Sequence, residues 1–169
     1  AGRQVLSLSP GPAPLEQAEH LKKYANMWRI TDDFWDEWRL LKGMFERAEK
    51  WCVHAAPGHW PDADMLPVGA LRQCYDQNGW TNFTQAEQRT MMTLWCMMRS
   101  PLMMGGELTK NDDFTLKLLT NRDVLAIEKT SACAHPLWTT EDESVWIAPR
   151  RDGKGLYAAL FNLSEETRT

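Results

Sequence analysis

The stretch Ala25-Asn26-Met27-Trp28-Arg29-Ile30, followed at once by Thr31-Asp32-Asp33, decides the fold class expected for this chain. It is a run of strand length that ends in polar residues, and residues 34–51 after it carry apolar side chains at helical spacing. The same order occurs upstream, with a strand candidate at residues 4–8 and a helix candidate at residues 15–24. The pattern therefore predicts repeated units of strand, loop and helix.

A third unit follows. Residues 58–66 form a strand candidate with a polar loop, and after an irregular stretch through Asn82 a helix is expected from about Thr84 to Arg99. Thr84 and Glu87 have the S/T-x-x-E spacing of a capping box, which predicts where that helix begins. Strands that alternate with helices predict an α/β fold with a parallel sheet, either open or closed into a barrel.

The character of the chain changes after Pro101. A short helix is expected at residues 114–119 and a brief apolar connection at residues 124–127. Three strand candidates then follow at residues 137–140, 145–148 and 156–162, with a hairpin turn at Asp152-Gly153. We therefore expect one α/β domain over residues 1–130 and the beginning of an antiparallel domain over residues 131–169. Because the chain starts without Met and stops just after a strand-like run, both ends are expected to be truncated.

Composition excludes several classes of partner. With 169 residues, 43% of them hydrophobic, and a net charge of -4, the chain is expected to be globular and has no basic stripe for nucleic acid. No apolar run reaches membrane-spanning length, so no membrane partner is expected. The four cysteines, Cys52, Cys74, Cys96 and Cys133, form no C-x-x-C pair, and neither a metal site nor a cofactor is expected. The nine tryptophans suit both a large core and the stacking of sugar rings.

Catalytic groups of parallel α/β proteins collect in the loops that follow the strands, which here are residues 7–12, 28–33 and 60–65. Two interpretations of Thr31-Asp32-Asp33 remain open. On the pattern alone, the commoner role is capping of the following helix. In the other interpretation, Arg29 grips sugar hydroxyls while Asp33 exchanges a proton with a glycosidic oxygen.

Three segments resemble glycoside hydrolase family 27, the α-galactosidase and α-N-acetylgalactosaminidase family. They are Trp28-Arg29-Ile30-Thr31-Asp32-Asp33, Gly58-His59-Trp60-Pro61-Asp62-Ala63-Asp64-Met65-Leu66 and Ser100-Pro101-Leu102-Met103-Met104-Gly105-Gly106-Glu107-Leu108. The resemblance implies the C-terminal part of a (β/α)8 TIM barrel followed by the start of an antiparallel β-sandwich.

The resemblance also implies roles for individual residues. Asp33 matches the acid/base of a retaining double displacement, and Arg29 matches a sugar-binding arginine. Asp64 and Met65 match pocket residues, and Trp28 and Trp60 are expected to wall the pocket. The family's nucleophile lies in a Lys-x-Asp segment on an earlier strand, and nothing before Asp33 supplies it. The 169 residues alone are therefore expected to be inactive.

The loop Ser7-Leu8-Ser9-Pro10-Gly11 departs from the family pattern. Many α-galactosidases place there a Glu that contacts the 2-hydroxyl of the sugar, whereas this loop has Leu8 or Ser9 at that position. The substituent at C2 of the substrate is therefore left open, with Ser9 as a candidate contact.

These observations lead to one main hypothesis and several alternatives. The main one is a retaining glycosidase that releases terminal α-galactosyl residues from a carbohydrate substrate. The alternatives are an α-N-acetylgalactosaminidase, a β-L-arabinopyranosidase and a sugar-binding barrel without catalysis. The resemblance is compatible with a secreted, periplasmic or lysosome-like compartment, and the oligomeric state is left open.

Overall fold

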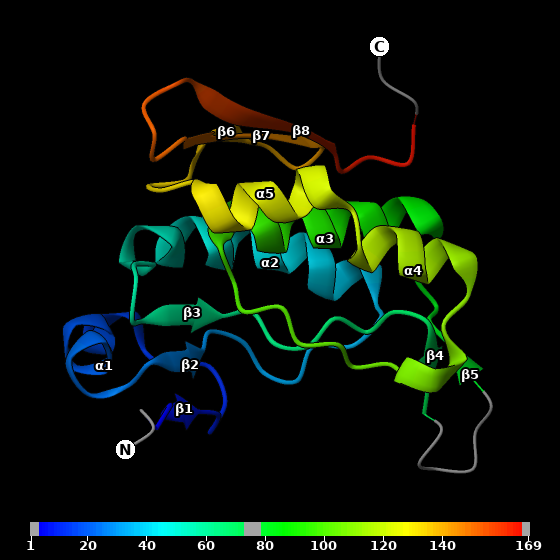
Figure 1. Ribbon diagram of the computed structural model, residues 1–169, viewed down its shortest axis with the longest axis horizontal. Helices are drawn as coiled ribbons and strands as arrows, with labels where there is room; N and C mark the ends of the chain where they lie inside the picture. The colour runs from blue at the N-terminus through cyan, green and yellow to red at the C-terminus, as the bar shows by residue number, and fades with distance from the viewer. Residues whose placement is uncertain (1–3, 73–78, 167–169) are drawn as a thin grey trace.

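The computed structural model describes residues 4–72 and 79–166, and its first part is a parallel sheet. The sheet has the strand order β1-β2-β3, with both neighbouring pairs parallel (Figure 1). Its strands are β1 (Ser7–Leu8), β2 (Met27–Arg29) and β3 (Trp60–Asp62). Helices α1 (Ala18–Tyr24) and α2 (Trp38–Trp51) return the chain between them, which confirms the predicted alternation of strands and helices.

The register of this sheet brings three loops to one level. Leu8 lies beside Trp28, and Arg29 lies beside Asp62, so the strands end at neighbouring positions on the same edge. Single turns of 3-10 helix at Leu15–Gln17 and Cys52–His54 precede α1 and follow α2. The loops after the carboxyl ends of the strands are therefore placed side by side.

Helix α2 begins later than the sequence pattern indicates. Apolar spacing predicted a helix from residue 34, but the first helical residue is Trp38, and Glu37 takes the N-cap position. The reason is tertiary, because the backbone N–H of Phe34 donates to Asp64 and the side chain of Asp36 accepts the N–H of Asn82. The predicted capping of α2 by Asp32 or Asp33 is therefore wrong.

The stretch expected to be irregular holds a short antiparallel pair. Its strands are β4 (Ala70–Leu71) and β5 (Gly79–Trp80), each too short to show a period in the sequence. Before this pair, Leu66 forms a parallel bridge with Met104, and the N–H of Gly105 donates to the carbonyl of Leu66 at 2.9 Å. Residues 103–105 therefore extend the row of parallel segments beyond β3.

The helix predicted from Thr84 is confirmed as α3 (Gln85–Met98). Both hydrogen bonds of the capping box are present, one from the Glu87 N–H to Thr84 Oγ1 at 3.2 Å and one from the Thr84 N–H to Glu87 Oε2 at 2.6 Å. Most of α3 is buried, including Trp95 and the residues around it. This helix supports the loop after β3, because Trp95 Nε1–H donates to the backbone carbonyl of Asp64.

Two further helices follow a 3-10 turn at Leu108–Lys110, namely α4 (Asp113–Leu119) and α5 (Arg122–Thr130). The short helix expected at residues 114–119 is confirmed, but the expected apolar connection at residues 124–127 is wrong, since it lies inside α5. Asn121 caps α5, because its Oδ1 accepts the N–H groups of Asp123 and Val124. Four apolar residues were too short a run to reveal the helical period.

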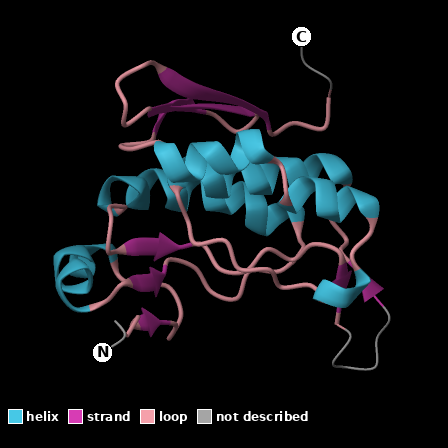
Figure 2. Cartoon of the chain, in the orientation of Figure 1, coloured by secondary structure: helices cyan, strands magenta, loops and turns pink. Residues whose placement is uncertain are grey.

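The last part of the described chain is an antiparallel sheet of β6 (His135–Thr139), β7 (Glu143–Pro149) and β8 (Leu156–Asn162). The predicted hairpin is confirmed, and Gly153 in its turn has a positive φ of 70°. Figure 2 shows helices α2, α3 and α5 lying between this sheet and the parallel one. Phe161 packs on Phe45 of α2 with ring centroids 5.0 Å apart, so the sheet shares one core with the helices.

Two further properties concern the described residues as a whole. None of their helices has both the length and the apolar composition that crossing a bilayer demands. Within residues 4–72 and 79–166, no three His, Cys, Asp or Glu side chains converge to hold a metal ion. Cys52 and Cys96 are buried free thiols and Cys133 is an exposed one, while Cys74 lies outside the described residues.

Candidate functional site

The guanidinium of Arg29 joins three loops at the carboxyl edge of the parallel sheet. Arg29 is the last residue of β2, and its side chain is only 9% exposed. Its Nη1 donates to Ser9 Oγ at 3.2 Å, from the loop after β1. Its Nη2 lies 2.9 Å from Asp64 Oδ2 and 3.3 Å from Asp33 Oδ1. One planar cation thus orders a hydroxyl and two carboxylates from separate segments.

Asp64 is fixed by both its backbone and its side chain. Its N–H donates to Asp62 Oδ1 at 2.9 Å, and its carbonyl accepts Trp95 Nε1–H at 3.1 Å. Its Oδ2 accepts the N–H of Phe34 at 2.7 Å in addition to the contact with Arg29. Within the described part of the chain, Asp64 Oδ1 takes part in no hydrogen bond. That oxygen can accept a hydrogen bond from a ligand hydroxyl.

Asp33 has the opposite environment. Its side chain is 85% exposed, and its contact with Arg29 is the longer of the two carboxylate contacts. An open hollow of about 440 Å³ lies beside it, lined by Ser9, Pro10, Gly11, Asp32 and Asp33. Ligand pockets of roughly 300–1,000 Å³ hold small molecules, so the hollow has room for a sugar unit. An accessible carboxyl on its wall can give or take a proton.

A second unsatisfied group belongs to Arg29 itself. Its Nε is buried and donates no hydrogen bond within the described structure. Because this nitrogen is buried, it is not accessible to a ligand in this structure.

Trp28 and Trp60, which were expected to wall the pocket, lie elsewhere. Trp28 is 1% exposed and packs on Trp51, with ring centroids 6.0 Å apart, because successive strand residues point to opposite faces and Arg29 takes the other face. Trp60 stands at the amino end of β3, where the Arg99 guanidinium lies 4.4 Å from its ring. The structure does not bring either ring to the Arg29 cluster.

Met65 follows Asp64 directly and is half-buried against the segment after α3. A Cβ placed on Gly105 would lie only 2.5 Å from Met65 Sδ, so the glycine makes room for the thioether. Met65 therefore borders the same loop as Asp64, while its side chain is held by residues 103–105.

An ion pair that sequence reasoning missed supports the loop after β2. The Asp36 side chain is 1% exposed and accepts hydrogen bonds from both terminal nitrogens of Arg72. Burial raises the pKa of Asp36, but the hydrogen bonds from Arg72 and from the Asn82 N–H outweigh it and leave the pKa below its usual value. The Arg72 guanidinium also lies 5.3 Å from the ring of Trp35. No spacing rule connects Asp36 with Arg72, because the β4–β5 pair brings them together.

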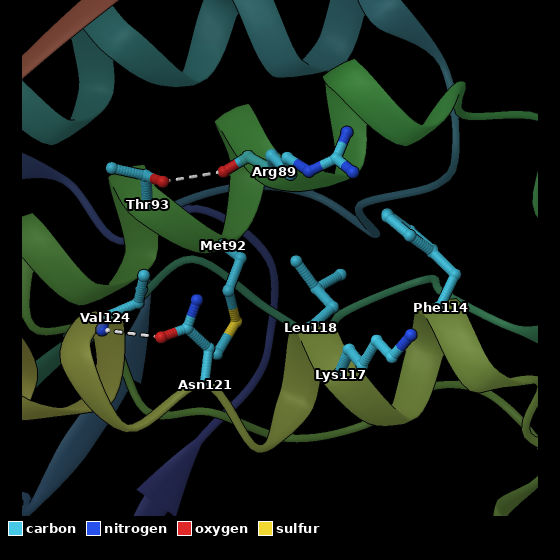
Figure 3. Close-up of a pocket in the computed structure, with 8 residues that line it drawn as sticks. All are labelled: Arg89, Met92, Thr93, Phe114, Lys117, Leu118, Asn121 and Val124. Carbon is cyan, nitrogen blue, oxygen red and sulfur yellow. Dashed lines mark hydrogen bonds between the residues drawn. The ribbon is translucent and has the colours of Figure 1, made fainter.

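A more enclosed pocket lies in another part of the molecule and has different chemistry. It measures about 240 Å³ and lies between α3 and the α4–α5 segment (Figure 3). Its lining consists of Arg89, Met92, Thr93, Phe114, Lys117, Leu118, Asn121 and Val124, and none of these carries a carboxyl group. The lining of this pocket therefore offers no carboxyl group for acid/base chemistry.

The chain is similar to known proteins over most of its length. Residues 10–130 match the family model described as alpha galactosidase A. A probable alpha-galactosidase D from Aspergillus niger is 33% identical over 149 residues, which cover 83% of this chain and 21% of that protein. The chain thus spans about a fifth of the length of that curated relative.

Two solved structures are similar over almost the whole chain. A GH27 β-L-arabinopyranosidase from Geobacillus stearothermophilus is 51% identical with a TM-score of 0.89, covering 96% of this chain and 38% of that one. A putative α-N-acetylgalactosaminidase from Bacillus halodurans is 47% identical with a TM-score of 0.76, covering 98% of this chain and 38% of that one. Both structures contain a large part that this chain does not match.

Proposed function

Since the chain belongs to the α-galactosidase family of glycoside hydrolases, we propose that it is part of a retaining exo-glycosidase whose general acid/base is Asp33. The observation that carries the proposal is the accessible Asp33 carboxyl, held by Arg29 at the carboxyl edge of the parallel strands. Acid/base groups in this position of α/β enzymes meet the substrate as it enters from the loop side.

The contacts of the Asp64 carboxylate indicate which role it takes in the proposed reaction. Asp64 Oδ2 is occupied by Arg29 and by the Phe34 N–H, and a carboxylate bound in this way is a poor nucleophile. We assign Asp64 to the binding of sugar hydroxyls through Oδ1. The nucleophile of the double displacement is then an aspartate outside these 169 residues.

In the first step the nucleophile attacks the anomeric carbon, the glycosidic bond breaks, and Asp33 gives its proton to the departing oxygen. In the second step Asp33 takes a proton from water, which attacks the glycosyl-enzyme and restores the free carboxylate. Arg29 orients Asp33 and Asp64 during both steps, and Ser9 fixes the far side of the guanidinium.

The proposal includes an architecture. Strands β1–β3 and the parallel segment at residues 103–105 would be the last strands of a (β/α)8 barrel over residues 1–130. The antiparallel β6–β8 sheet would begin a β-sandwich over residues 131–169.

The sugar is a terminal α-galactosyl residue in the leading form of the proposal. A β-L-arabinopyranoside, which lacks the C6 hydroxymethyl of an α-galactoside, is a second candidate because a β-L-arabinopyranosidase is 51% identical to this chain. A panel of nitrophenyl glycosides tested on the full-length protein separates the two from each other and from an α-N-acetylgalactosaminide. Hydrolysis of none of them would favour the sugar-binding alternative.

Asp33→Ala in the full-length protein tests the acid/base assignment. Substrates with a poor leaving group should lose about 10²–10⁴-fold in kcat/KM, whereas nitrophenyl glycosides should lose much less in the step that releases the phenol. Asp113→Ala, which changes an exposed aspartate on α4, is the control for general damage. Wild-type rates of the Asp33 variant on both kinds of substrate would overturn the assignment.

A further inference from the structure

Asp62 lies beneath the proposed sugar-binding loop without touching the hollow. It is the last residue of β3, is only 5% exposed, and pairs in register with Arg29 of β2. Its backbone carbonyl accepts the N–H of Ile30 at 3.0 Å, so its position in the sheet is fixed. Its side-chain Oδ1 accepts the N–H of Asp64 at 2.9 Å.

The residue that Asp62 holds has an unusual backbone. Asp64 has a φ of 76°, in the left-handed region that L-residues other than glycine rarely adopt. The preceding residue is held as well, because the N–H of Ala63 donates to Ser100 Oγ at 2.9 Å. The left-handed turn aims the Asp64 carboxylate at Arg29 and at the N–H of Phe34. An extended residue at this position would point its side chain in another direction.

We propose that Asp62 is a positioning residue for sugar binding, which holds Asp64 in the left-handed conformation through its carboxylate oxygen. The inference rests on the proposed function, because it concerns the affinity of the same site for sugar. Asp62 acts through Asp64 and contacts neither the hollow nor the reacting atoms.

The proposal requires an acceptor at residue 62 and not a charge. Burial raises the pKa of Asp62, and the nearby charge of Asp64 raises it further, while the Asp64 N–H and Arg29 act in the opposite direction. An asparagine offers the same acceptor without an ionised group in a buried place. Asp62→Asn is therefore expected to retain function, and Asp62→Ala to lose it.

The experiment measures binding of the free monosaccharide product together with KM and kcat for a nitrophenyl glycoside, on the full-length protein. Asp62→Ala should raise the inhibition constant of the monosaccharide and KM by about tenfold, with a smaller change in kcat. Asp62→Asn should stay within about threefold of wild type in all three. Ser100→Ala, which removes the acceptor of the neighbouring N–H, should lower the melting temperature without this loss of sugar affinity.

A double-mutant cycle separates positioning from general support. If Asp62 acts through Asp64, then Asp62→Ala should weaken sugar binding no further once Asp64→Ala is present. Additive losses, or wild-type sugar affinity of Asp62→Ala, would overturn the inference. If Asp62→Ala does not fold, Asp62→Glu serves instead, since its longer side chain moves the acceptor and should raise KM while keeping the charge. Failure of the wild-type protein to bind any sugar of the panel would instead contradict the proposed function.

Discussion

Arg29 and Asp64 meet through a contact of 2.9 Å between Nη2 and Oδ2, although Arg29 ends β2 and Asp64 follows β3. The same nitrogen lies 3.3 Å from Asp33, so one group sets the position of both carboxylates. This arrangement depends on the planar fork of a guanidinium, which a lysine ammonium does not reproduce.

Arg29→Lys in the full-length protein should therefore lower kcat/KM by about 100-fold, since a loss of about 2.7 kcal/mol is within the range for breaking a buried charged hydrogen bond. Steady-state kinetics on a nitrophenyl glycoside measures the effect. Arg39→Lys is the matched control, because Arg39 is exposed and pairs with Glu37 away from the cluster. A loss of less than threefold for Arg29→Lys would contradict the role given to the guanidinium.

Trp28→Ala tests the place of Trp28 in the core. Removing a fully buried indole should destabilise the protein by about 3–5 kcal/mol, which a denaturant midpoint reports. The folded fraction should bind the monosaccharide as wild type does. Trp28→Phe should cost less, because the indole Nε1 donates no hydrogen bond within the described residues. A loss of sugar affinity without a loss of stability would contradict this role and would indicate that Trp28 contacts the sugar.

Asp36→Asn should show a pH-dependent loss of stability. The pKa of Asp36 lies below its ordinary value in the folded protein, so its stabilising effect is complete above the unfolded pKa of about 3.9 and is lost as the pH falls through the folded pKa. We expect a deficit of about 2 kcal/mol near pH 7, as for a hydrogen bond to a charged group. The deficit should shrink below about pH 4.

Melting temperatures of wild type and Asp36→Asn between pH 3 and pH 7 measure this effect. Arg72→Gln, which removes the other half of the pair, should follow the same trend. A gap between the two melting curves that stays constant with pH would show that the ionised form of Asp36 does not matter.

Gly106→Ala should be strongly destabilising, because its Cβ would clash with the backbone carbonyl oxygen of Val68. We expect a loss of about 1–3 kcal/mol or a local shift of the segment after α3. Gly43→Ala is the matched control, since its Cβ would meet only the end of the flexible Arg47 side chain at 3.2 Å. That change should be neutral or stabilise α2 by up to about 1 kcal/mol. Equal effects of the two changes would contradict the close approach at Gly106.

The main features of the fold could be predicted because they repeat over many residues. Strand and helix alternation is visible around Met27 to Trp51, and the capping box at Thr84 predicted the start of α3 correctly. The predictions were wrong where tertiary contacts determine the end of an element or where an apolar run is too short to show a period. The start of α2 is delayed by bonds from Phe34 and Asp36 to distant residues.

The candidate site was predictable in part for the same reason. Loops after parallel strands converge, so Ser9, Arg29 and Asp64 could be expected near one another, and the structure joins them. The role of Asp62 depends on a single side-chain bond to a backbone N–H, which no spacing in the sequence reveals. Alternation along a strand could have shown that Trp28 and Arg29 face opposite ways.

The left-handed backbone of Asp64 restricts which mutations this position can tolerate. Glutamate would keep the charge but lacks the short polar side chain with which Asp and Asn accommodate this conformation. Glycine would accept the backbone and lose the carboxylate, and asparagine would keep the shape but give up the ion pair with Arg29. Residue 64 must therefore adopt a left-handed backbone and also carry a carboxylate that pairs with Arg29, and aspartate meets both requirements. Random mutagenesis of residue 64 with selection for activity should recover almost nothing else.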